Sequence, residues 1–465
     1  SVEEAKDRIA AAIKNSGLES PKRTNKKIVL SLAPAALKKE GAVFDIPLAL
    51  SFLLASEQVR FDPSGKLFAG ELSLDGIIRP IRGALSIAAR ARVDGFTDLY
   101  LPAENAEEAS LVSDIRIHPI IDLAQAVMVL EKGNDLPYVS RVRKSGASTD
   151  TSLDEIRGQE SAKRGLIIAA AGGHNIALYG PPGTGKTMLA RAAISILPDL
   201  SEAETIEVTT IHSLAGVSEG AIIRRPPLRS PHHTSSYASL IGGGSASPRP
   251  GEATLAHRGV LFLDEFPEFH RDVIQALREP LEDGIVSIAR SKGSSMFPAN
   301  FMLIAALNPC PCGYWGSSRC ECMPHAVEKY RRKISGPIAD RIDMWVSVGE
   351  MPLESLSLKH APSVEQTARA RENVAHARER QRMRFRGSPG LITNADMRAK
   401  DIEIHAHLSE KTESALLGPE ERMKLSPPGF HRTIKLARTI ADLAQSEKIE
   451  TPHMLEALQY RARDL

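Results

Sequence analysis

Residues 175–187 read NIALYGPPGTGKT, and this stretch decides the fold of the chain around it. A short apolar run at residues 176–179 has the composition of a buried strand, and the helical pattern MLARAAISIL begins after the glycines. The loop between them fits G-x-x-x-x-G-K-[ST], in which glycines let backbone N–H groups wrap a phosphate at the start of a helix. A plain Gly/Pro turn is the alternative, but the flanks favour a nucleoside triphosphate site. Its residues are Gly180, Pro181, Pro182, Gly183, Thr184, Gly185, Lys186 and Thr187.

Lys186 and Thr187 carry the chemically active side chains of this loop. The Lys186 ammonium is expected to reach the β- and γ-phosphates of ATP, and the Thr187 hydroxyl to bind Mg²⁺. A second apolar strand, residues 259–263, ends in Asp264 and Glu265. Acidic pairs end many strands by chance. Behind a phosphate loop, however, they predict a carboxylate for the Mg²⁺ shell, Asp264, and a base that polarises the attacking water, Glu265. ATP and Mg²⁺ are therefore the expected cofactors.

A third apolar strand, residues 300–307, ends at Asn308. Its neutral amide can orient the attacking water and sense the γ-phosphate, although a strand-end asparagine is often only a turn former. This order of motifs resembles the AAA+ ATPases, and the resemblance implies the sensor role for Asn308. It also implies that Ile156 and Gln159, with the helix that follows them, form the wall that grips the adenine. The ATPase core is expected at residues 156–350.

Residues 335–343 read SGPIADRID and contain Arg341. They resemble an element of the magnesium-chelatase and replicative-helicase AAA+ subunits whose arginine enters the neighbouring subunit's site. A guanidinium there neutralises charge in the transition state of phosphoryl transfer. The alternative is an ion pair within the chain, with Asp340 or Asp343. The resemblance implies a ring, expected to be a homo-hexamer.

Two insertions separate these motifs. Residues 221–259 are polar, glycine-rich and too long to be a simple connecting loop in a compact domain. Residues 283–298 show the alternation of strands around a turn, which predicts a hairpin. Both placements match those that magnesium-chelatase-like and replicative-helicase ATPases use to line the pore of the ring. Arg229, Arg290 and Lys292 would then contact the phosphates of DNA. A solvated surface loop is the alternative for both insertions.

All four cysteines of the chain fall within residues 310–322, in two C-x-C pairs. Four soft ligands so close together suit a tetrahedral, structural Zn²⁺ ion, although C-x-C is tighter than the usual C-x₂-C. Reduced thiols or a redox pair are the alternatives. A catalytic metal is not expected, because no ligand position would stay open. The ligand set would be Cys310, Cys312, Cys320 and Cys322.

Residues 1–135 are predicted to form a small α+β domain. The stretch GELSLDGIIRPIRGA, followed by a helix and by DGFTDLYLPAEN, resembles the proteolytic domain of Lon-type proteases. That family's nucleophilic serine and its lysine map onto Val43 and Leu85. The resemblance therefore implies the fold without the protease chemistry, since no Ser–Lys pair remains to be activated. Ser86 and Lys38 are the nearby substitutes.

Residues 351–465 are predicted to form an all-helical lid. Its stretch FHRTIKLARTIADL, together with LRSPHHT, FLDEFPEF and NPCPCGY, resembles the ComM-type proteins of the magnesium-chelatase-like AAA+ group. The resemblance covers the whole chain and implies a DNA helicase that promotes branch migration during natural transformation. The group usually has an arginine, the sensor 2 position, where this chain has Pro428. Arg432 or Arg438 would then substitute in the ATP site, and an ion pair within the lid is the alternative for Arg432.

The chain as a whole sets further bounds. Its 465 residues include 59 Lys+Arg and 57 Asp+Glu, which gives a formal charge of +2. Such a small net charge does not indicate a nucleic-acid partner, so any contact with DNA would come from local basic patches. No apolar run approaches a membrane span and no signal peptide opens the chain, which predicts a cytoplasmic protein without membrane contact. Because the chain begins inside a helical pattern without Met, further upstream sequence is expected.

The predicted fold class is α/β. An AAA+ P-loop core, with a parallel sheet flanked by helices, is expected to carry an all-α lid. A linker at residues 136–155 would join this core to the N-terminal Lon-like domain. An ATPase that remodels a protein partner, like the magnesium-chelatase subunit, is the competing function.

Overall fold

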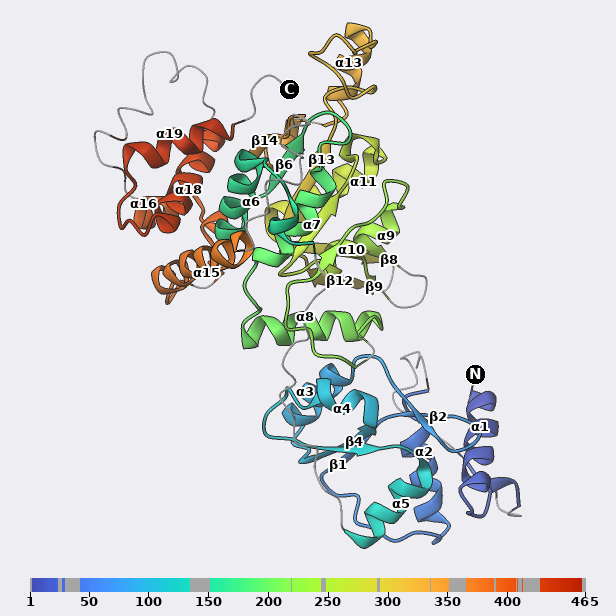
Figure 1. The fold of residues 1–465 in the computed structure, drawn as a ribbon. Coiled ribbons are helices and arrows are strands. Elements are labelled where there is room, and N and C mark those ends of the chain that lie inside the picture. The colour runs from blue at the N-terminus through green and yellow to red at the C-terminus, as the bar shows by residue number, and fades with distance from the viewer. Residues whose placement is uncertain are drawn as a thin grey trace. The chain divides into compact units, whose positions relative to one another are not determined.

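The computed structural model of the protein is shown in Figure 1. The described residues are 2–23, 27–29, 42–133, 151–218, 220–243, 248–290, 293–334, 336–350, 365–388, 390–406, 408, 412 and 427–461. Contacts within the chain divide it into two compact units. Unit 1 comprises residues 1–145 and 202–224, and unit 2 comprises residues 146–201 and 225–465.

Unit 1 is built on a three-stranded parallel sheet in the order β1-β4-β5, with a separate two-stranded hairpin formed by β2 and β3. Apolar side chains from α1, α2 and α5 pack with Tyr100 of β4 into one buried cluster. The elements are α1 (Val2–Asn15), α2 (Asp45–Ala55), β1 (Lys66–Phe68), β2 (Glu71–Leu72), β3 (Ile78–Arg79), α3 (Ala84–Val93), β4 (Asp98–Pro102), α4 (Ala106–Ala109), β5 (Arg116–Ile120) and α5 (Leu123–Lys132).

Helix α8 (Glu202–Ala215) also belongs to unit 1, although the chain reaches it only after the phosphate loop. Its Ser213 hydroxyl accepts a hydrogen bond of 2.9 Å from the backbone N–H of Gly83 and also bonds the carboxyl of Glu108, whose pKa is raised by burial. We expected a continuous core over residues 156–350, whereas residues 202–224 pack with the N-terminal residues. Helical periodicity marks an apolar face but does not say which unit that face packs against.

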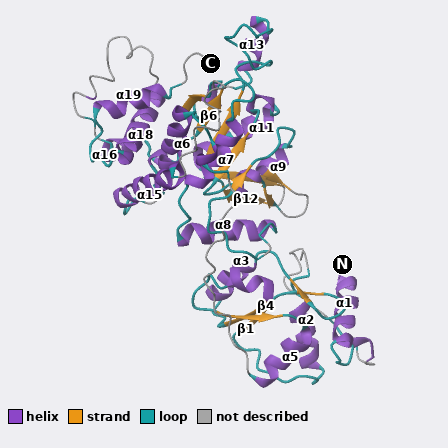
Figure 2. Cartoon of the chain, in the orientation of Figure 1, coloured by secondary structure: helices purple, strands orange, loops and turns teal. Residues whose placement is uncertain are grey.

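Unit 2 contains a five-stranded parallel sheet in the order β14-β6-β13-β10-β7. Alternate residues of the strands face opposite sides, as strand geometry requires. Ile176 and Leu178 of β6 pack in one cluster with α6 and α7, while Ala177 packs in a second cluster with α9 and α11. Figure 2 shows helices around these strands. The prediction of a parallel sheet flanked by helices is confirmed. The strands are β6 (Ile176–Tyr179), β7 (Leu228–Arg229), β10 (Val260–Leu263), β13 (Met302–Leu307) and β14 (Met344–Ser347).

Residues 221–259, which we took for one insertion, contain part of the core. Strand β7 lies in this stretch and pairs with β10 at the edge of the main sheet. A two-stranded ribbon and two short helices follow it. The second insertion is the expected hairpin, formed by β11 and β12. The remaining elements of this part are α6 (Glu160–Gly172), α7 (Lys186–Ile196), α9 (Tyr237–Ile241), β8 (Gly242–Gly243), β9 (Arg249–Pro250), α10 (Glu252–Leu255), α11 (Arg271–Ala276), α12 (Arg278–Asp283), β11 (Ile285–Arg290), β12 (Gly293–Pro298), α13 (Pro324–Arg331) and α14 (Gly336–Ala339).

The C-terminal part is helical, as expected, and shares the core of unit 2. Val374 of α15 and Ile440 of α18 are buried in the same cluster as the strand residue Ile176. The elements are α15 (Gln366–Arg384), α16 (Ala399–His405), α18 (Pro427–Leu443) and α19 (Thr451–Gln459). Among the described residues, no helix of the protein is both long enough and apolar enough to cross a membrane.

Candidate nucleotide site

The phosphate loop, residues 180–187, joins the end of β6 to the start of α7. Gly183 and Gly185 have φ values of 78° and 89°, which only glycine adopts without strain, and a Cβ atom on either would meet nothing within 4 Å. Gly180 is required for another reason, because its Cβ would lie 2.1 Å from the carbonyl oxygen of Val348. The loop therefore has the backbone shape and the open side that a phosphate group needs.

Lys186 lies at the centre of this loop. Its Nζ donates to the carbonyl oxygens of Gly180 at 2.8 Å and Pro181 at 2.7 Å, and to Oδ1 of Asn308 at 3.1 Å. Burial lowers the pKa of Lys186, while the charge of Asp264 opposes that change. The ammonium is thus already aimed between the loop and Asn308, where phosphate oxygens would be stronger acceptors than these neutral groups. The structure thus brings together Lys186 and Asn308, two residues to which the sequence analysis gave separate roles at the γ-phosphate.

Thr187 and Asp264 also meet. The Thr187 hydroxyl, in the first turn of α7, donates to Oδ2 of Asp264 at 2.7 Å, directly after β10. A hydroxyl and a carboxylate at this distance offer the oxygen ligands that Mg²⁺ prefers, with the remaining positions left to water and phosphates. These two residues fit the magnesium role predicted for them.

Glu265 follows Asp264 in an unusual backbone conformation, with φ at 51°. Its side chain is 54% exposed, and Oε2 lies 2.9 Å from Nδ1 of His233. The sequence analysis named no role for His233, which follows β7 in the chain. The contact could not be found from the sequence, since residues 233 and 265 are joined only through the folded sheet.

Ile156 and Gln159 precede α6. Ile156 is buried, and Gln159 adopts a left-handed conformation with φ at 56°. The Gln159 amide donates to the carbonyl oxygen of Gly349 at 2.8 Å, so it links the segment before α6 to the segment after β14. The adenine-binding role of both residues stays a prediction.

Arg341 forms an ion pair within the chain, but with neither Asp340 nor Asp343, the two aspartates that the sequence analysis considered. Its guanidinium donates to the carbonyl oxygen of Pro337 at 2.6 Å and forms an ion pair with Glu282. Asp343 instead accepts from the backbone N–H of Asn175 at 3.0 Å, and Asp340 pairs with Arg432. A role of Arg341 in a neighbouring subunit would require the pair with Glu282 to open.

The two arginines proposed for the sensor 2 position differ sharply in exposure. Arg432 reaches the carbonyl oxygen and the carboxylate of Asp340, next to Arg341. Arg438 is only 2% exposed and is bound to the buried Asp442 in the lid. The burial of Arg438 and its ion pair with Asp442 are those of a residue that stabilises the lid, so they do not support it in the sensor 2 role. Arg432 remains the candidate.

The residues predicted to bind DNA are described only in part. Arg229 is occupied by a bidentate ion pair with Glu252, at 2.6 and 2.8 Å. Arg290 is the last residue of β11 and pairs with Gly293 at the tip of the hairpin. Lys292 lies outside the described residues.

The four cysteines gather in one place. Their sulfur atoms all lie within 4.8 Å of one another, so they could hold a metal ion. The backbone N–H of Tyr314 lowers the pKa of the Cys312 thiol to about 6, whereas the neighbouring thiols of Cys310 and Cys312 raise the pKa values of Cys320 and Cys322. The sequence prediction of a common site for all four cysteines fits this geometry.

The positions of a protease dyad are apolar in unit 1. Val43 packs against the cluster of Ala69, Ile81 and Ala84, and Leu85 is 1% exposed. Ser86 lies beside Leu85 on α3, while Lys38 falls outside the described residues.

Comparisons with known proteins place the whole chain in one group. Family models match residues 152–356 (Magnesium chelatase, subunit ChlI), 1–105 (Subunit ChlI of Mg-chelatase) and 364–461 (Magnesium chelatase, subunit ChlI C-terminal). The competence protein ComM of Haemophilus influenzae is 40% identical over 468 residues, which cover 99% of this chain and 90% of that protein. The uncharacterized protein YifB of Escherichia coli is 40% identical, over 100% of this chain and 90% of its own length. An uncharacterized protein of Mycobacterium tuberculosis is 38% identical, over 99% and 91%. The chain therefore belongs to the ComM/YifB-type magnesium-chelatase-like AAA+ proteins, a family whose fold implies an ATPase that uses ATP and Mg²⁺.

Proposed function

We propose that this protein is an ATP-driven ring motor, a homo-hexamer that acts in the cytoplasm as a DNA helicase or branch-migration factor in natural transformation or recombination. The observation that carries the proposal is the arrangement of the nucleotide site. Lys186 lies 3.1 Å from Asn308, and Thr187 lies 2.7 Å from Asp264, so side chains from two strand ends converge on the phosphate loop. A loop, a cation, a carboxylate pair and a polar sensor are what phosphoryl transfer from ATP requires.

The roles follow from these positions. Lys186 and the loop N–H groups bind the phosphates, Thr187 and Asp264 hold the Mg²⁺ shell, and Glu265 takes the proton of the attacking water. Asn308, whose amide oxygen accepts from Lys186, would align that water. Mg²⁺ would supply charge neutralisation on the phosphate oxygens. His233, at 2.9 Å, holds Glu265 when no water is being activated.

DNA is the proposed substrate because of the relative named ComM, which is similar to this chain over almost its full length. The hairpin tip, with Arg290 and Lys292, is the proposed contact for DNA phosphates. Arg229 contributes only if its ion pair with Glu252 opens. This opening has a cost, since both partners are partly buried, at 31% and 21% exposure of their side chains.

The ring is proposed from Arg341 and Arg432. Both arginines lie at the same segment, around Asp340, and both are engaged with acidic groups of their own chain. In the ring, Arg341 would leave Glu282 and bind the phosphates of a nucleotide in the neighbouring subunit, and Arg432 would leave Asp340 and bind those in its own subunit. ATP turnover would then depend on assembly. A Zn²⁺ ion in the four-cysteine cluster belongs to the same proposal, as a structural and not a catalytic metal.

A second candidate function is the remodelling of a protein partner. It is favoured by the match of residues 152–356 and 364–461 to family models of a magnesium-chelatase subunit. Both functions need the same ATP site, so the site does not separate them.

The test is a strand-displacement assay on forked duplex DNA and on a four-way junction, with ATP and Mg²⁺. The proposal expects displacement that requires hydrolysis and is lost in Glu265→Gln, together with hexamers seen by mass photometry in the presence of a slowly hydrolysed ATP analogue. ATP turnover without displacement of any of these substrates would contradict the helicase and favour a protein partner.

A further inference from the structure

The cysteine loop, residues 310–322, holds its shape with almost no buried side chain of its own. Within this fully described stretch, Cys310 and Gly313 are the only buried residues, and turns and bends take the place of helix and strand. Fixing a backbone costs conformational entropy, so a loop without a core needs another interaction to hold it.

The sulfur positions indicate what that interaction is. The Sγ atom of Cys310 lies 3.3 Å from that of Cys312 and 3.9 Å from that of Cys320, and the Cys312 and Cys320 sulfurs are 3.6 Å apart. These separations are far longer than the roughly 2.05 Å of a disulfide bond. Four sulfurs bound at about 2.3 Å around one Zn²⁺ would be about 3.8 Å apart, the edge of a regular tetrahedron. The cluster therefore has the dimensions of a closed Zn²⁺ site with Cys322 as the fourth ligand.

The same loop rests on the phosphate loop. Gly313 has a φ of 88°, and a Cβ atom placed on it would lie 2.6 Å from Cδ of Pro182. Its backbone N–H donates to the carbonyl oxygen of Cys310 at 3.0 Å, so the contact is tied to the first cysteine of the cluster. Pro182 is the exposed middle of the phosphate loop, whose shape decides how the backbone N–H groups meet a phosphate.

The beginning of the cysteine loop is tied to the catalytic residues as well. Asn308 stands two residues before Cys310 and accepts the hydrogen bond of 3.1 Å from Lys186. A metal that fixes Cys310 therefore also limits the positions of Asn308. The cysteine loop therefore contacts the nucleotide site directly at Pro182, and it is connected to Lys186 through Asn308, which precedes it.

We propose that the four cysteines bind one structural Zn²⁺ ion and that the metal-held cysteine loop braces the phosphate loop, so that the metal content of the protein sets the affinity of its nucleotide site. The inference rests on the proposed ATP site and adds a metal dependence to it. All four thiolates are used as ligands, so the metal has no open position for a substrate.

Two glycine variants test the contact without touching a cysteine. Gly313→Ala and Gly316→Ala strain the backbone alike, because the two glycines have φ values of 88° and 90° in the same loop. A Cβ on Gly316 would meet nothing within 4 Å, whereas a Cβ on Gly313 would collide with Pro182. The measurements are zinc per chain, by elemental analysis of protein purified without added metal, and the Kd of a fluorescent ADP analogue.

We expect both variants to carry about one Zn²⁺ per chain, the number that four ligands bind. Gly313→Ala should bind the ADP analogue about tenfold more weakly than the unaltered protein, the equivalent of ~1.4 kcal/mol. Gly316→Ala should bind it with unchanged affinity. Equal affinities of the two variants would overturn the bracing contact, and zinc near zero in the unaltered protein would overturn the metal site.

Metal removal gives a second, independent test on the unaltered chain. The zinc is displaced with a mercurial reagent and a chelator, the thiols are then restored with a reductant, and ADP-analogue binding is measured before and after Zn²⁺ is added back. Binding that weakens on removal and returns with Zn²⁺ supports the proposal. Unchanged binding after removal would overturn it while leaving the ATP site intact. Failure of the zinc-loaded protein to bind any nucleotide would overturn the proposed function, and this inference with it.

Discussion

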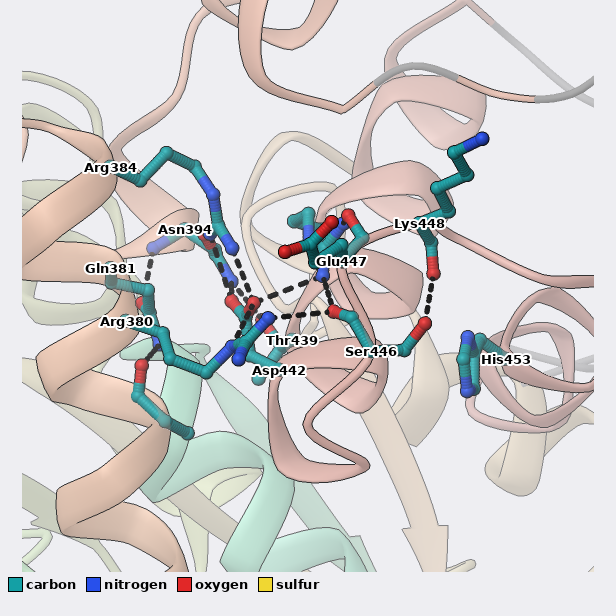
Figure 3. A network of polar contacts seen from close by, with 12 residues as sticks. Arg380, Gln381, Arg384, Asn394, Thr439, Asp442, Ser446, Glu447, Lys448 and His453 are labelled. Atoms are coloured by element: carbon teal, nitrogen blue, oxygen red, sulfur yellow. Dashed lines mark hydrogen bonds and ion pairs between the residues drawn. The ribbon is translucent and has the colours of Figure 1, made fainter.

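The carboxylate of Asp442 should be among the costliest single groups to remove from unit 2. It is fully buried in the lid, and Figure 3 shows the polar groups that converge on it. Its Oδ2 accepts from Arg384 at 2.9 Å and from Asn394 at 2.9 Å, and its Oδ1 accepts from Arg438 at 3.0 Å. A third arginine is also close, since the Nε atom of Arg380 lies 3.8 Å from Oδ1. One carboxylate thus balances several arginines.

The size of the expected loss in stability follows from the buried charge that remains when the carboxylate is removed. The Arg438 side chain is 3% exposed, and burial lowers its pKa while the charge of Asp442 opposes that change. In Asp442→Ala this guanidinium keeps its bonds to the carbonyl oxygens of Ser446 and Glu447 but loses its counter-charge. Removing one partner of a buried pair costs about 3–5 kcal/mol, because the other charge stays buried and uncompensated.

The assay is urea unfolding followed by tryptophan fluorescence. The chain has two tryptophans, Trp315 and Trp345, and both belong to unit 2. With a urea dependence of about 3 kcal/mol per molar, a loss of this size moves the midpoint down by roughly 1 M or more. Asp199→Ala is the matched control, since it breaks an Arg–Asp pair of 2.8 Å with Arg371 in the same unit but at 40% and 55% exposure. An exposed pair of this kind contributes below about 1 kcal/mol. A midpoint shift in Asp442→Ala no larger than that of Asp199→Ala would refute the reasoning.

Four further variants test the nucleotide site and the ring. Lys186→Ala should weaken ATP binding roughly 100-fold, because it removes a charge-assisted contact to two phosphates; calorimetry that finds native affinity would contradict the assignment. Glu265→Gln should bind ATP normally yet hydrolyse it at least about 100-fold more slowly, and normal turnover would remove Glu265 from the role of the base. Arg341→Ala should lose turnover by about 1,000-fold with ATP binding intact, and mixing it with Lys186→Ala should restore some activity if the guanidinium acts on the neighbouring subunit; no recovery would place its effect within one chain. Arg290→Ala combined with Lys292→Ala should leave basal ATP hydrolysis unchanged while DNA affinity falls and depends less on salt, and unaltered DNA binding would exclude the hairpin tip.

Much of the nucleotide site could be predicted because its signals are local. The strand at residues 176–179 has the predicted bounds, since an apolar run ends where the glycines begin. Asp264 and Asn308 follow two other buried strands, and the carboxyl ends of parallel strands meet at one edge of a sheet. Their closeness to Thr187 and Lys186 follows from that rule, and the structure shows both contacts.

The remaining features depend on contacts between distant parts of the chain. Strand β7 is only two residues long, which is too short to show any periodicity. Its pairing with β10 can be seen only in the folded sheet. Helix α8 has an ordinary sequence, and only the folded chain shows that it packs in unit 1. Arg438 is an arginine on a helix, and its burial depends on Asp442 and the neighbouring helices. The contacts of His233 with Glu265 and of Gly313 with Pro182 join residues far apart in the sequence, so no spacing rule points to them.

The central claim is that the ATP site drives work on DNA, and the most direct test is the rate of ATP hydrolysis with and without DNA. Hydrolysis would be measured at fixed ATP and Mg²⁺, with single-stranded and forked DNA added at low salt, and Glu265→Gln as the inactive control. The account predicts a clear stimulation of turnover by DNA that declines as salt rises, because phosphate contacts are salt-sensitive. Steady turnover that no DNA substrate changes would contradict it and make a protein the partner of this motor.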